Sequence, residues 1–328
     1  MKAVVFAGKG GPEVAGIQEI AAPVAQRGEV LVRVRAAALN RADLLQRRGL
    51  YPPPPGFRAD VPGLEFAGEV AALGDGVTGW KVGDRVMAIA SGEAQAEYAI
   101  ADPFMLLGIP EGMSFALAAA IPEAGITAHD ALATLGGFRS GGTALVHAIG
   151  SGVGTMALQI AKAMGGTVIG TARSADKIEK ARALGLDHAI LVGKEEPRFA
   201  DEVKRITGRR GAPVVLDFVG APYMAENLAS LASQGRVVVV GTMGGPRASV
   251  DLGVLMRARG RIVGTVLRPR PLFEKIQATQ AFARDVMPLV LAGRVKPVLD
   301  RAWPAAEVQA AHEQLERNDS FGKVVLEF

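Results

Sequence analysis

The chain has 328 residues, of which 49% are hydrophobic and 21% are charged, and its formal net charge is +4. This composition excludes a disordered protein, and the length is sufficient for two domains. The basic residues form only short clusters, which are typical of a solvated surface rather than of a nucleic-acid site. The sequence contains no cysteine, which excludes disulfide bonds, thiol nucleophiles and cysteine-held zinc.

No apolar run approaches the ~20 residues that are needed to span a bilayer. The N-terminal residues MKAVVFAG are typical of a first β-strand rather than of a signal peptide. We therefore expect a soluble, cytoplasmic protein.

The first third of the chain carries short β-type runs separated by glycine and proline, without long helices between them, which favours a barrel-like or partly open β domain. The predicted strands are Lys2–Phe6, Glu29–Ala38, Glu65–Leu73, Asp84–Ile89 and Ala96–Ile100. Four prolines follow Tyr51 directly. Because a proline run cannot join a helix or a sheet interior, it predicts a stiff surface loop.

From about Ser114 helices and strands alternate, and the strands are rich in valine and isoleucine without a clean polar alternation. This pattern is typical of a parallel sheet covered on both faces. Two helices, Phe115–Ala120 and Ile126–Leu135, lead into the series. The predicted strands are Ala144–His147, Thr167–Thr171, Val214–Asp217, Arg236–Val240 and Arg261–Thr265. The predicted helices between them are Val153–Met164, Ala175–Ala183, Glu202–Ile206, Met224–Leu231 and Leu252–Arg259.

The last part of the chain resembles the first in pattern. It predicts, in order, a helix Phe273–Leu291, a strand Leu299–Trp303, a helix Ala305–Glu316 and a strand Lys323–Phe328. The predicted fold class is α/β, with a Rossmann-type doubly wound parallel sheet inserted into a β-rich domain. We expect the β-rich domain over residues 1–120 and 269–328 and the nucleotide-binding domain over 121–268, with the ligand in the cleft between them.

The stretch from Ala144 to Lys177 predicts a strand, a glycine-rich turn, a helix and a second strand. A turn of this kind directs backbone N–H groups and the positive end of a helix dipole at a pyrophosphate. Its glycines, at 150, 152 and 154, do not satisfy the strict G-x-G-x-x-G spacing, so an ordinary glycine-rich turn stays an alternative. The second strand ends on Arg173 rather than on an acidic residue, which favours the 2′-phosphate of NADP over the ribose of NAD.

Seven segments together resemble the medium-chain dehydrogenase/reductase superfamily, in its zinc-free quinone oxidoreductase branch. The resemblance covers the whole chain. Within the branch the chain most resembles the tumour-suppressor-inducible quinone oxidoreductases and, more distantly, zeta-crystallin. The segments are ALNRADLLQRRGLYPPPPG (38–56), GLEFAGEV (63–70), VGDRVMA (82–88), AAAIPEAGITA (118–128), HAIGSGVGTMALQIAK (147–162), VVVVGTMGG (237–245) and GKVVLEF (322–328).

The resemblance implies a GroES-like catalytic domain formed by both chain ends, a Rossmann domain between them, and a homodimer or a dimer of dimers. It also implies the sites of NADPH and of a small quinone or enone substrate. The pyrophosphate would lie against Ser151, Gly152, Val153 and Gly154, and the 2′-phosphate against Arg173, Ser174 and Lys177. The nicotinamide would lie against Thr127, Val240, Gly241, Met243, Leu267 and Arg268. The substrate would lie against Asn40 and Tyr51. Several relatives place a tyrosine against the adenosine phosphate where this chain has Val192, which implies a weaker preference for NADP.

The positions that hold the metal in zinc-dependent relatives correspond to Asn40, Leu64 and Glu123. A leucine cannot bind a metal, and one amide with one carboxylate is a poor zinc set. Reduction of a quinone or an enone gives a phenolate or an enolate, and since a phenol has a pKa of about 10, hydrogen-bond donors suffice to stabilise the anion. Asn40 and Tyr51 could supply these donors, with Tyr51 or solvent giving the proton. Alternatively, Asn40 is the N-cap of a helix over 41–47 and Tyr51 packs on the prolines.

The sequence therefore predicts an NADPH-dependent quinone reductase without a metal. The alternatives are a reductase of α,β-unsaturated carbonyl compounds or enoyl thioesters, and an NADPH-binding structural or RNA-binding protein of the crystallin type. The low aromatic content of 5% disfavours the last. We expect His147 and His129 to be structural, His129 having no evident acid partner, and Asp217 to cap the turn at Gly220.

Overall fold

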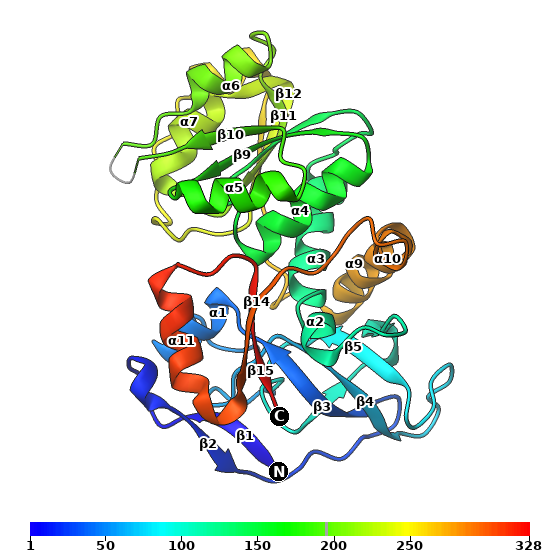
Figure 1. The fold of residues 1–328 in the computed structure, drawn as a ribbon. Coiled ribbons are helices and arrows are strands. Elements are labelled where there is room, and N and C mark those ends of the chain that lie inside the picture. Colours follow the sequence, from blue (N-terminus) through cyan, green and yellow to red (C-terminus); the bar gives the residue numbers. More distant parts are fainter. Residues whose placement is uncertain (194–195) are drawn as a thin grey trace. The chain divides into compact units, whose positions relative to one another are not determined.

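The computed structural model describes residues 1–193 and 196–328. The chain divides into two compact units, which are described separately (Figure 1). Unit 1 comprises Met1–Ile126, Leu267–Arg284 and Pro297–Phe328, and unit 2 comprises Thr127–Val266 and Asp285–Lys296. The first boundary lies six residues later than the sequence predicts, at 126 rather than 120, and residues 285–296 return to unit 2.

Unit 1 is built on an extended sheet with the strand order β14-β15-β3-β4-β5-β7, and β6 pairs with β3. The strands are β3 (Val30–Ala38), β4 (Glu65–Leu73), β5 (Arg85–Ile89), β6 (Tyr98–Ala101), β7 (Leu106–Gly108), β14 (Leu299–Pro304) and β15 (Lys323–Glu327). A separate antiparallel pair consists of β1 (Lys2–Phe6) and β2 (Ala15–Glu19). The strand β15 runs antiparallel to β3 and parallel to β14, so the end of the chain completes the sheet that its beginning starts.

The helices of unit 1 cover this sheet and its core, in which valine, leucine and phenylalanine side chains of β3, β4 and β5 pack together. The helices are α1 (Arg41–Arg47), α2 (Phe115–Ala119), α9 (Leu272–Asp285) and α11 (Val308–Arg317), with 3₁₀ turns at Pro12–Val14, Pro103–Met105 and Ala305–Glu307. The helix α3 (Pro122–His129) contains the boundary between the units.

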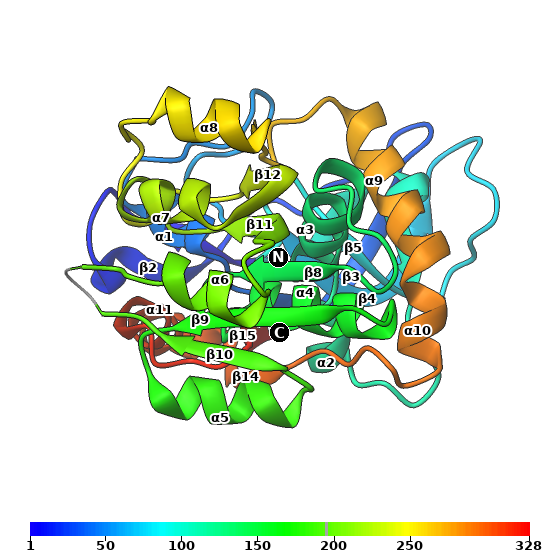
Figure 2. The same cartoon turned by 90° about the horizontal axis from the view of Figure 1, so that it is seen from above.

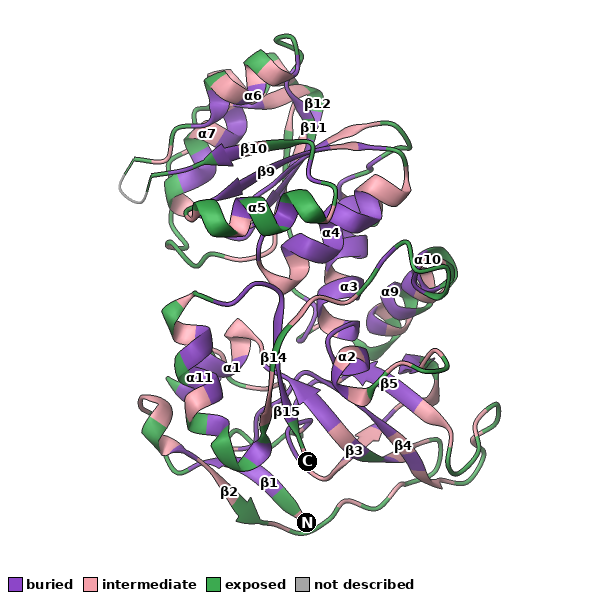
Figure 3. Cartoon of the chain, in the orientation of Figure 1, coloured by how far each residue is buried: buried purple, intermediate pink, exposed green. Residues whose placement is uncertain are grey.

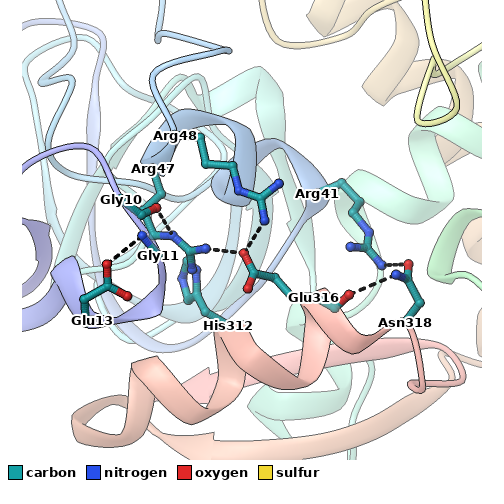
Figure 4. Close-up of polar contacts among 9 residues, drawn as sticks. All are labelled: Gly10, Gly11, Glu13, Arg41, Arg47, Arg48, His312, Glu316 and Asn318. Carbon is teal, nitrogen blue, oxygen red and sulfur yellow. Dashed lines mark hydrogen bonds and ion pairs between the residues drawn. The ribbon is translucent and has the colours of Figure 1, made fainter.

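One buried arginine joins α1 to α11 (Figure 4). The Arg47 side chain is fully buried, and its guanidinium donates to the carbonyl oxygen of Gly10 at 3.1 Å and to Nδ1 of His312 at 2.9 Å. It also forms an ion pair with Glu316, which Arg48 contacts from the exposed side at 2.6 Å. Burial and the Arg47 charge lower the pKa of His312 to about 3, so the imidazole is neutral and its Nδ1 accepts the hydrogen bond.

Unit 2 contains a parallel sheet with the order β10-β9-β8-β11-β12-β13, which can be followed in Figure 2. Its strands are β8 (Thr143–Val146), β9 (Thr167–Ala172), β10 (His188–Leu191), β11 (Ala212–Asp217), β12 (Leu231–Val239) and β13 (Arg261–Gly264). All five pairings between neighbours are parallel, and the chain reverses its direction of progress between β10 and β11. This is the doubly wound Rossmann order, as the sequence predicts.

The helices of unit 2 lie on both faces of this sheet, with α4 and α5 on one side and α6 and α7 on the other (Figure 1). They are α4 (Gly152–Ala163), α5 (Ala175–Ala183), α6 (Ala200–Ile206), α7 (Met224–Ala229), α8 (Leu252–Ala258) and α10 (Met287–Leu291), with a 3₁₀ turn at Ala221–Tyr223. The central strands β8, β9 and β11 are largely buried, whereas α5 is largely exposed (Figure 3). Both faces being covered explains the absence of polar alternation in the strand sequences.

Two predicted helices differ in the structure, and some strands were not predicted. The helix expected over 273–291 is two helices, α9 and α10, which are separated at Val286 because Pro288 opens the second one. The helix expected over 126–135 is α3 followed by a π-helical segment, Asp130–Leu135. The strands β2 and β10 were not predicted because their sequences are short and only partly apolar. Within the described residues no helix is both long and apolar enough to cross a membrane.

Candidate active site

The glycine turn of unit 2 leads into α4, whose N-cap is Ser151. The Ser151 Oγ accepts a hydrogen bond from the backbone N–H of Gly154 at 3.0 Å, which is the usual N-cap contact. The backbone N–H groups of Gly152 and Val153 have no protein acceptor in the described part of the chain, and both residues are partly exposed. A Cβ at Gly154 would lie 2.5 Å from the carbonyl oxygen of Ala148, so only glycine permits this tight turn. Two free donors at the N-terminus of a 12-residue helix fit a pyrophosphate.

A buried chain of hydrogen bonds lies directly beneath this turn and joins the carboxyl ends of β8, β9 and β11. His147 contacts Thr171 Oγ1 through Nδ1 at 2.8 Å and Asn227 Oδ1 through Nε2 at 2.6 Å. Asn227 in turn donates to Asp217 Oδ2 at 2.9 Å. Because the Asn227 amide oxygen can only accept, Nε2 of His147 carries the proton and Nδ1 accepts from the Thr171 hydroxyl. Burial lowers the pKa of His147 to about 4, so its imidazole is neutral at pH 7. The network holds the ends of the three strands in place.

Asp217 is the last residue of this hydrogen-bond network. Its Oδ1 accepts from the backbone N–H groups of Val219 at 2.7 Å and Gly220 at 3.0 Å, as the sequence predicts for a turn cap. Its carbonyl oxygen accepts from the backbone N–H groups of Val240 and Gly241. The predicted nicotinamide residues Val240 and Gly241 are therefore fixed to the same end of the sheet as the glycine turn, while Met243 beyond them is exposed.

The residues predicted for the 2′-phosphate lie at the end of β9. Arg173 is exposed, Ser174 is the N-cap of α5 without using its hydroxyl for the cap, and Lys177 lies one turn into that helix. Val192 is buried in the core of the sheet and offers no polar group. Burial raises the pKa of the Tyr223 hydroxyl, and the nearby Arg173 charge opposes this. Tyr223 packs edge-on against His147 at 4.8 Å, so its ring also belongs to this end of the sheet.

His129 has an acid partner that the sequence did not reveal. Its Nε2 lies 3.1 Å from Oδ2 of Asp285, which belongs to the segment of the chain that returns to unit 2. The pair fixes the end of α3, the helix that also carries the predicted cofactor residue Thr127. The structural role predicted for His129 fits this contact.

Unit 1 holds a buried cluster of charged groups around Lys323. Its Nζ donates to Glu65 Oε1 at 2.7 Å, to Asn40 Oδ1 at 2.7 Å and to the carbonyl oxygen of Leu39 at 2.8 Å. The side chain of Glu65 is fully buried and that of Lys323 nearly so. Three acceptors satisfy all three N–H groups of the ammonium. No sequence motif indicates the pairing of Lys323 with Glu65.

The Asn40 amide is fully occupied by this cluster. Its Nδ2 donates to Glu65 Oε1 at 3.0 Å and contacts the carbonyl oxygen of Ala38 at 3.4 Å, while its Oδ1 accepts from Lys323. Its backbone N–H donates to Asp43 Oδ2 at 2.7 Å at the start of α1. This geometry supports the structural alternative for Asn40 more than a role as donor to a substrate.

Tyr51 lies beside a buried arginine. The Arg268 guanidinium lies 5.4 Å from the centre of the Tyr51 ring and donates to the Tyr51 carbonyl oxygen at 3.3 Å. It also donates to Ser91 O at 2.8 Å and Gln46 Oε1 at 2.7 Å. All these residues belong to unit 1. The predicted cofactor residue Arg268 thus donates to three protein acceptors and supports the Tyr51 loop, and its neighbour Leu267 is buried.

Two carboxyl groups of unit 1 have raised pKa values. Burial raises the pKa of Asp43 to about 6, although hydrogen bonds from Asn40 and Gly63 oppose the shift. Burial and the adjacent Glu65 raise the pKa of Glu123 to about 8. Glu123 is therefore mainly protonated at pH 7. Among the described residues, no three histidine, aspartate or glutamate side chains are placed to hold a metal ion.

Two family models match the chain. The alcohol dehydrogenase GroES-like domain matches residues 26–130, and the zinc-binding dehydrogenase model matches residues 152–283. A quinone oxidoreductase of Pseudomonas aeruginosa is 35% identical over 331 residues, which covers 99% of both chains. The synaptic vesicle membrane protein VAT-1 homolog of Rattus norvegicus is 34% identical and covers 99% of this chain and 84% of its own.

Solved structures show the same fold. The mycobacterial protein Rv1454c complexed with NADPH has a TM-score of 0.89 at 29% identity, with both chains covered completely. The Escherichia coli quinone oxidoreductase complexed with NADPH has a TM-score of 0.87 at 28% identity, again over the full length of both chains. The chain belongs to the medium-chain dehydrogenase/reductase superfamily of oxidoreductases, and its relatives include quinone oxidoreductases similar along its whole length.

Proposed function

We propose that the protein reduces a quinone with NADPH, without a metal ion. The observation that carries the proposal is the residue set in unit 1. Asn40, Leu64 and Glu123 cannot form a zinc site, whereas the Tyr51 hydroxyl and the protonated Glu123 carboxyl are hydrogen-bond donors. Such donors suit an acceptor whose reduced form is a stabilised phenolate. The similarity to quinone oxidoreductases over the full chain supports the same activity.

The residues of each unit have separate tasks. NADPH supplies the hydride. In unit 2, the free N–H groups of Gly152 and Val153 bind the pyrophosphate, and Arg173 and Lys177 bind the 2′-phosphate. The network from Thr171 to Asp217 keeps the strand ends in the geometry that this binding needs. In unit 1, Tyr51 donates to the acceptor oxygen, and Arg268 holds the Tyr51 loop in place.

The test is a steady-state panel with NADPH against 1,4-benzoquinone, phenanthrenequinone, a 2-alkenal and crotonyl-CoA. Turnover of the quinones at a higher kcat/KM than the alkenal and the thioester supports the proposal. A preference for the alkenal or the thioester would assign the protein to reductases of unsaturated carbonyl compounds instead. No turnover of any acceptor, with NADPH binding intact, would point to a structural role.

Replacement of Arg173 tests the cofactor assignment. We expect Arg173→Ala to raise the KM for NADPH about 10- to 100-fold, because a charge-assisted hydrogen bond to phosphate contributes about 1.5–3 kcal/mol. The KM for NADH should not change. Arg182→Ala, which removes an exposed arginine from the helix α5 that follows Arg173, is the matched control. An unchanged ratio of NADPH to NADH turnover in Arg173→Ala would contradict the assignment.

We also propose a cytoplasmic homodimer that forms through the edge of the unit 2 sheet. The strand β13 is the last strand of that sheet, and three of its four residues are exposed. Exposed apolar side chains cluster in the same part of the sequence, at Leu252, Met256, Ile262 and Val266. A second copy would pair the open strand edge and cover these side chains. Sedimentation should give a dimer, and Ile262→Lys should shift it toward the monomer; a monomeric wild-type protein would refute the proposal.

A further inference from the structure

In the buried cluster of unit 1, most of the polar side chains described have protein partners. Asn40, Glu65 and Lys323 use their donors and acceptors within the cluster, and Arg268 donates to three protein acceptors. The Tyr51 hydroxyl and the Glu123 carboxyl, in contrast, make no hydrogen bond to any described residue, and both side chains are partly exposed. These two groups are therefore available to form a hydrogen bond with a ligand.

The backbone fixes where the Glu123 carboxyl lies. Glu123 is in the first turn of α3, and its N–H donates to Glu65 Oε2 at 2.8 Å. This bond attaches the start of the helix to the fully buried end of β4. The Glu123 carboxyl interacts electrostatically with the Tyr51 hydroxyl and with the Lys275 ammonium of α9, so all three belong to one cluster.

The charges around Glu123 favour its protonated form. Two carboxyl groups face it, Glu65 from β4 and Asp43 from α1, and both oppose a further negative charge. The cations Lys323 of β15 and Arg268 act in the other direction, as does Lys275. Lys323 and Arg268 are already bonded to other acceptors, and Lys275 donates to Ser91 Oγ. Burial and the carboxyl neighbours dominate, so the pKa of Glu123 rises to about 8.

We propose that Glu123 is a catalytic acid that gives its carboxyl proton to the acceptor after hydride transfer. The inference rests on the proposed function. Hydride from NADPH adds to the quinone and leaves NADP⁺ and a phenolate anion. The O–H bond of Glu123 then breaks as the new O–H bond of the hydroquinone forms, and the resulting carboxylate regains its proton from solvent. Quinone, NADPH and one proton thus give hydroquinone and NADP⁺.

The test is the pH profile of kcat with NADPH and a quinone, for wild type and Glu123→Gln. Wild-type kcat should be constant below about pH 8 and fall tenfold per pH unit above it, because only the protonated carboxyl donates. Glu123→Gln should lose this pH dependence and turn over about 100-fold more slowly at pH 7, the effect typical of losing a general acid. Glu123→Asp, which keeps a carboxyl, should restore part of the rate and the pH dependence.

Three controls separate the inference from its alternatives. Glu111→Gln, at an exposed glutamate of unit 1, should leave the profile unchanged. Tyr51→Phe should lower kcat but keep the decline above pH 8; loss of the decline in this variant instead would assign the proton to Tyr51 and overturn the inference. NADPH binding, measured by fluorescence, should be the same in wild type and Glu123→Gln.

The outcomes for the two proposals differ. If wild type reduces quinones but Glu123→Gln keeps its rate and its pH profile, the acid role is wrong and the proposed function stands. If wild type does not reduce quinones, both proposals are wrong.

A second measurement needs no substrate. Because the pKa of Glu123 is raised in the folded state, ionisation of this group destabilises the fold as the pH rises toward 8. Above that pH, Glu123→Gln should unfold at a higher temperature than wild type, and equal unfolding temperatures would overturn the raised pKa.

Discussion

Arg47→Met should destabilise unit 1 by about 3–5 kcal/mol, the cost of breaking a buried ion pair from one side. The substitution removes a fully buried guanidinium and leaves its three partners behind. The carbonyl oxygen of Gly10 and Nδ1 of His312 would lose a donor, and the His312 ring is fully buried and has no access to solvent. The measurement is the free energy of unfolding in urea at pH 7.

Arg48→Met is the matched control for this prediction. Arg48 contacts the same carboxylate, Glu316, but half of its side chain is exposed. An exposed ion pair contributes about 0–1 kcal/mol, so this variant should be close to wild type. If the two variants lost the same amount of stability, burial would not be what makes Arg47 important.

Lys323→Met should cost a similar amount, about 3–5 kcal/mol, and should also disturb the start of α1. Without the ammonium, Glu65 keeps a fully buried carboxylate whose remaining donors are the Asn40 amide and the N–H of Glu123. The Asn40 amide oxygen loses its donor at the same time.

A double variant checks the cause. Glu65→Gln removes the buried charge but keeps an acceptor for Asn40, so Lys323→Met combined with Glu65→Gln should be more stable than Lys323→Met alone. The measurement is a double-mutant cycle of unfolding free energies at pH 7. Equal stability of the single and the double variant would show that the loss comes from packing and not from the unpaired carboxylate.

Much of the fold could be predicted because its signals are local. The strand at Glu65–Leu73 and the helix at Ala175–Ala183 have the predicted bounds, since an apolar run and an alternating charge pattern are read directly from neighbouring residues. The glycine turn was predicted in the same way. The division before Pro288 was missed, although a proline in the middle of a predicted helix itself indicates a break there.

The site was harder to predict because its contacts are long-range. Asn40 was expected to face the substrate, yet its side chain is held by Lys323, 283 residues later in the chain. His129 gained its partner Asp285 only because residues 285–296 return to unit 2. Glu123 was noted only as a poor metal ligand, since a pKa depends on which charges the fold brings close, and the sequence does not show this.

The position of β15 bears on how the protein is made. The sheet of unit 1 is complete only when β15 pairs with β3, and these strands lie at opposite ends of the sequence. During synthesis, the whole sheet of unit 2 leaves the ribosome before β15 does. Unit 2 can therefore fold while the edge of β3 that pairs with β15 is still open. A chain released before Lys323 would also leave the Glu65 carboxylate buried without its cation. Unit 1 therefore completes its sheet only after the whole of unit 2 has been synthesised.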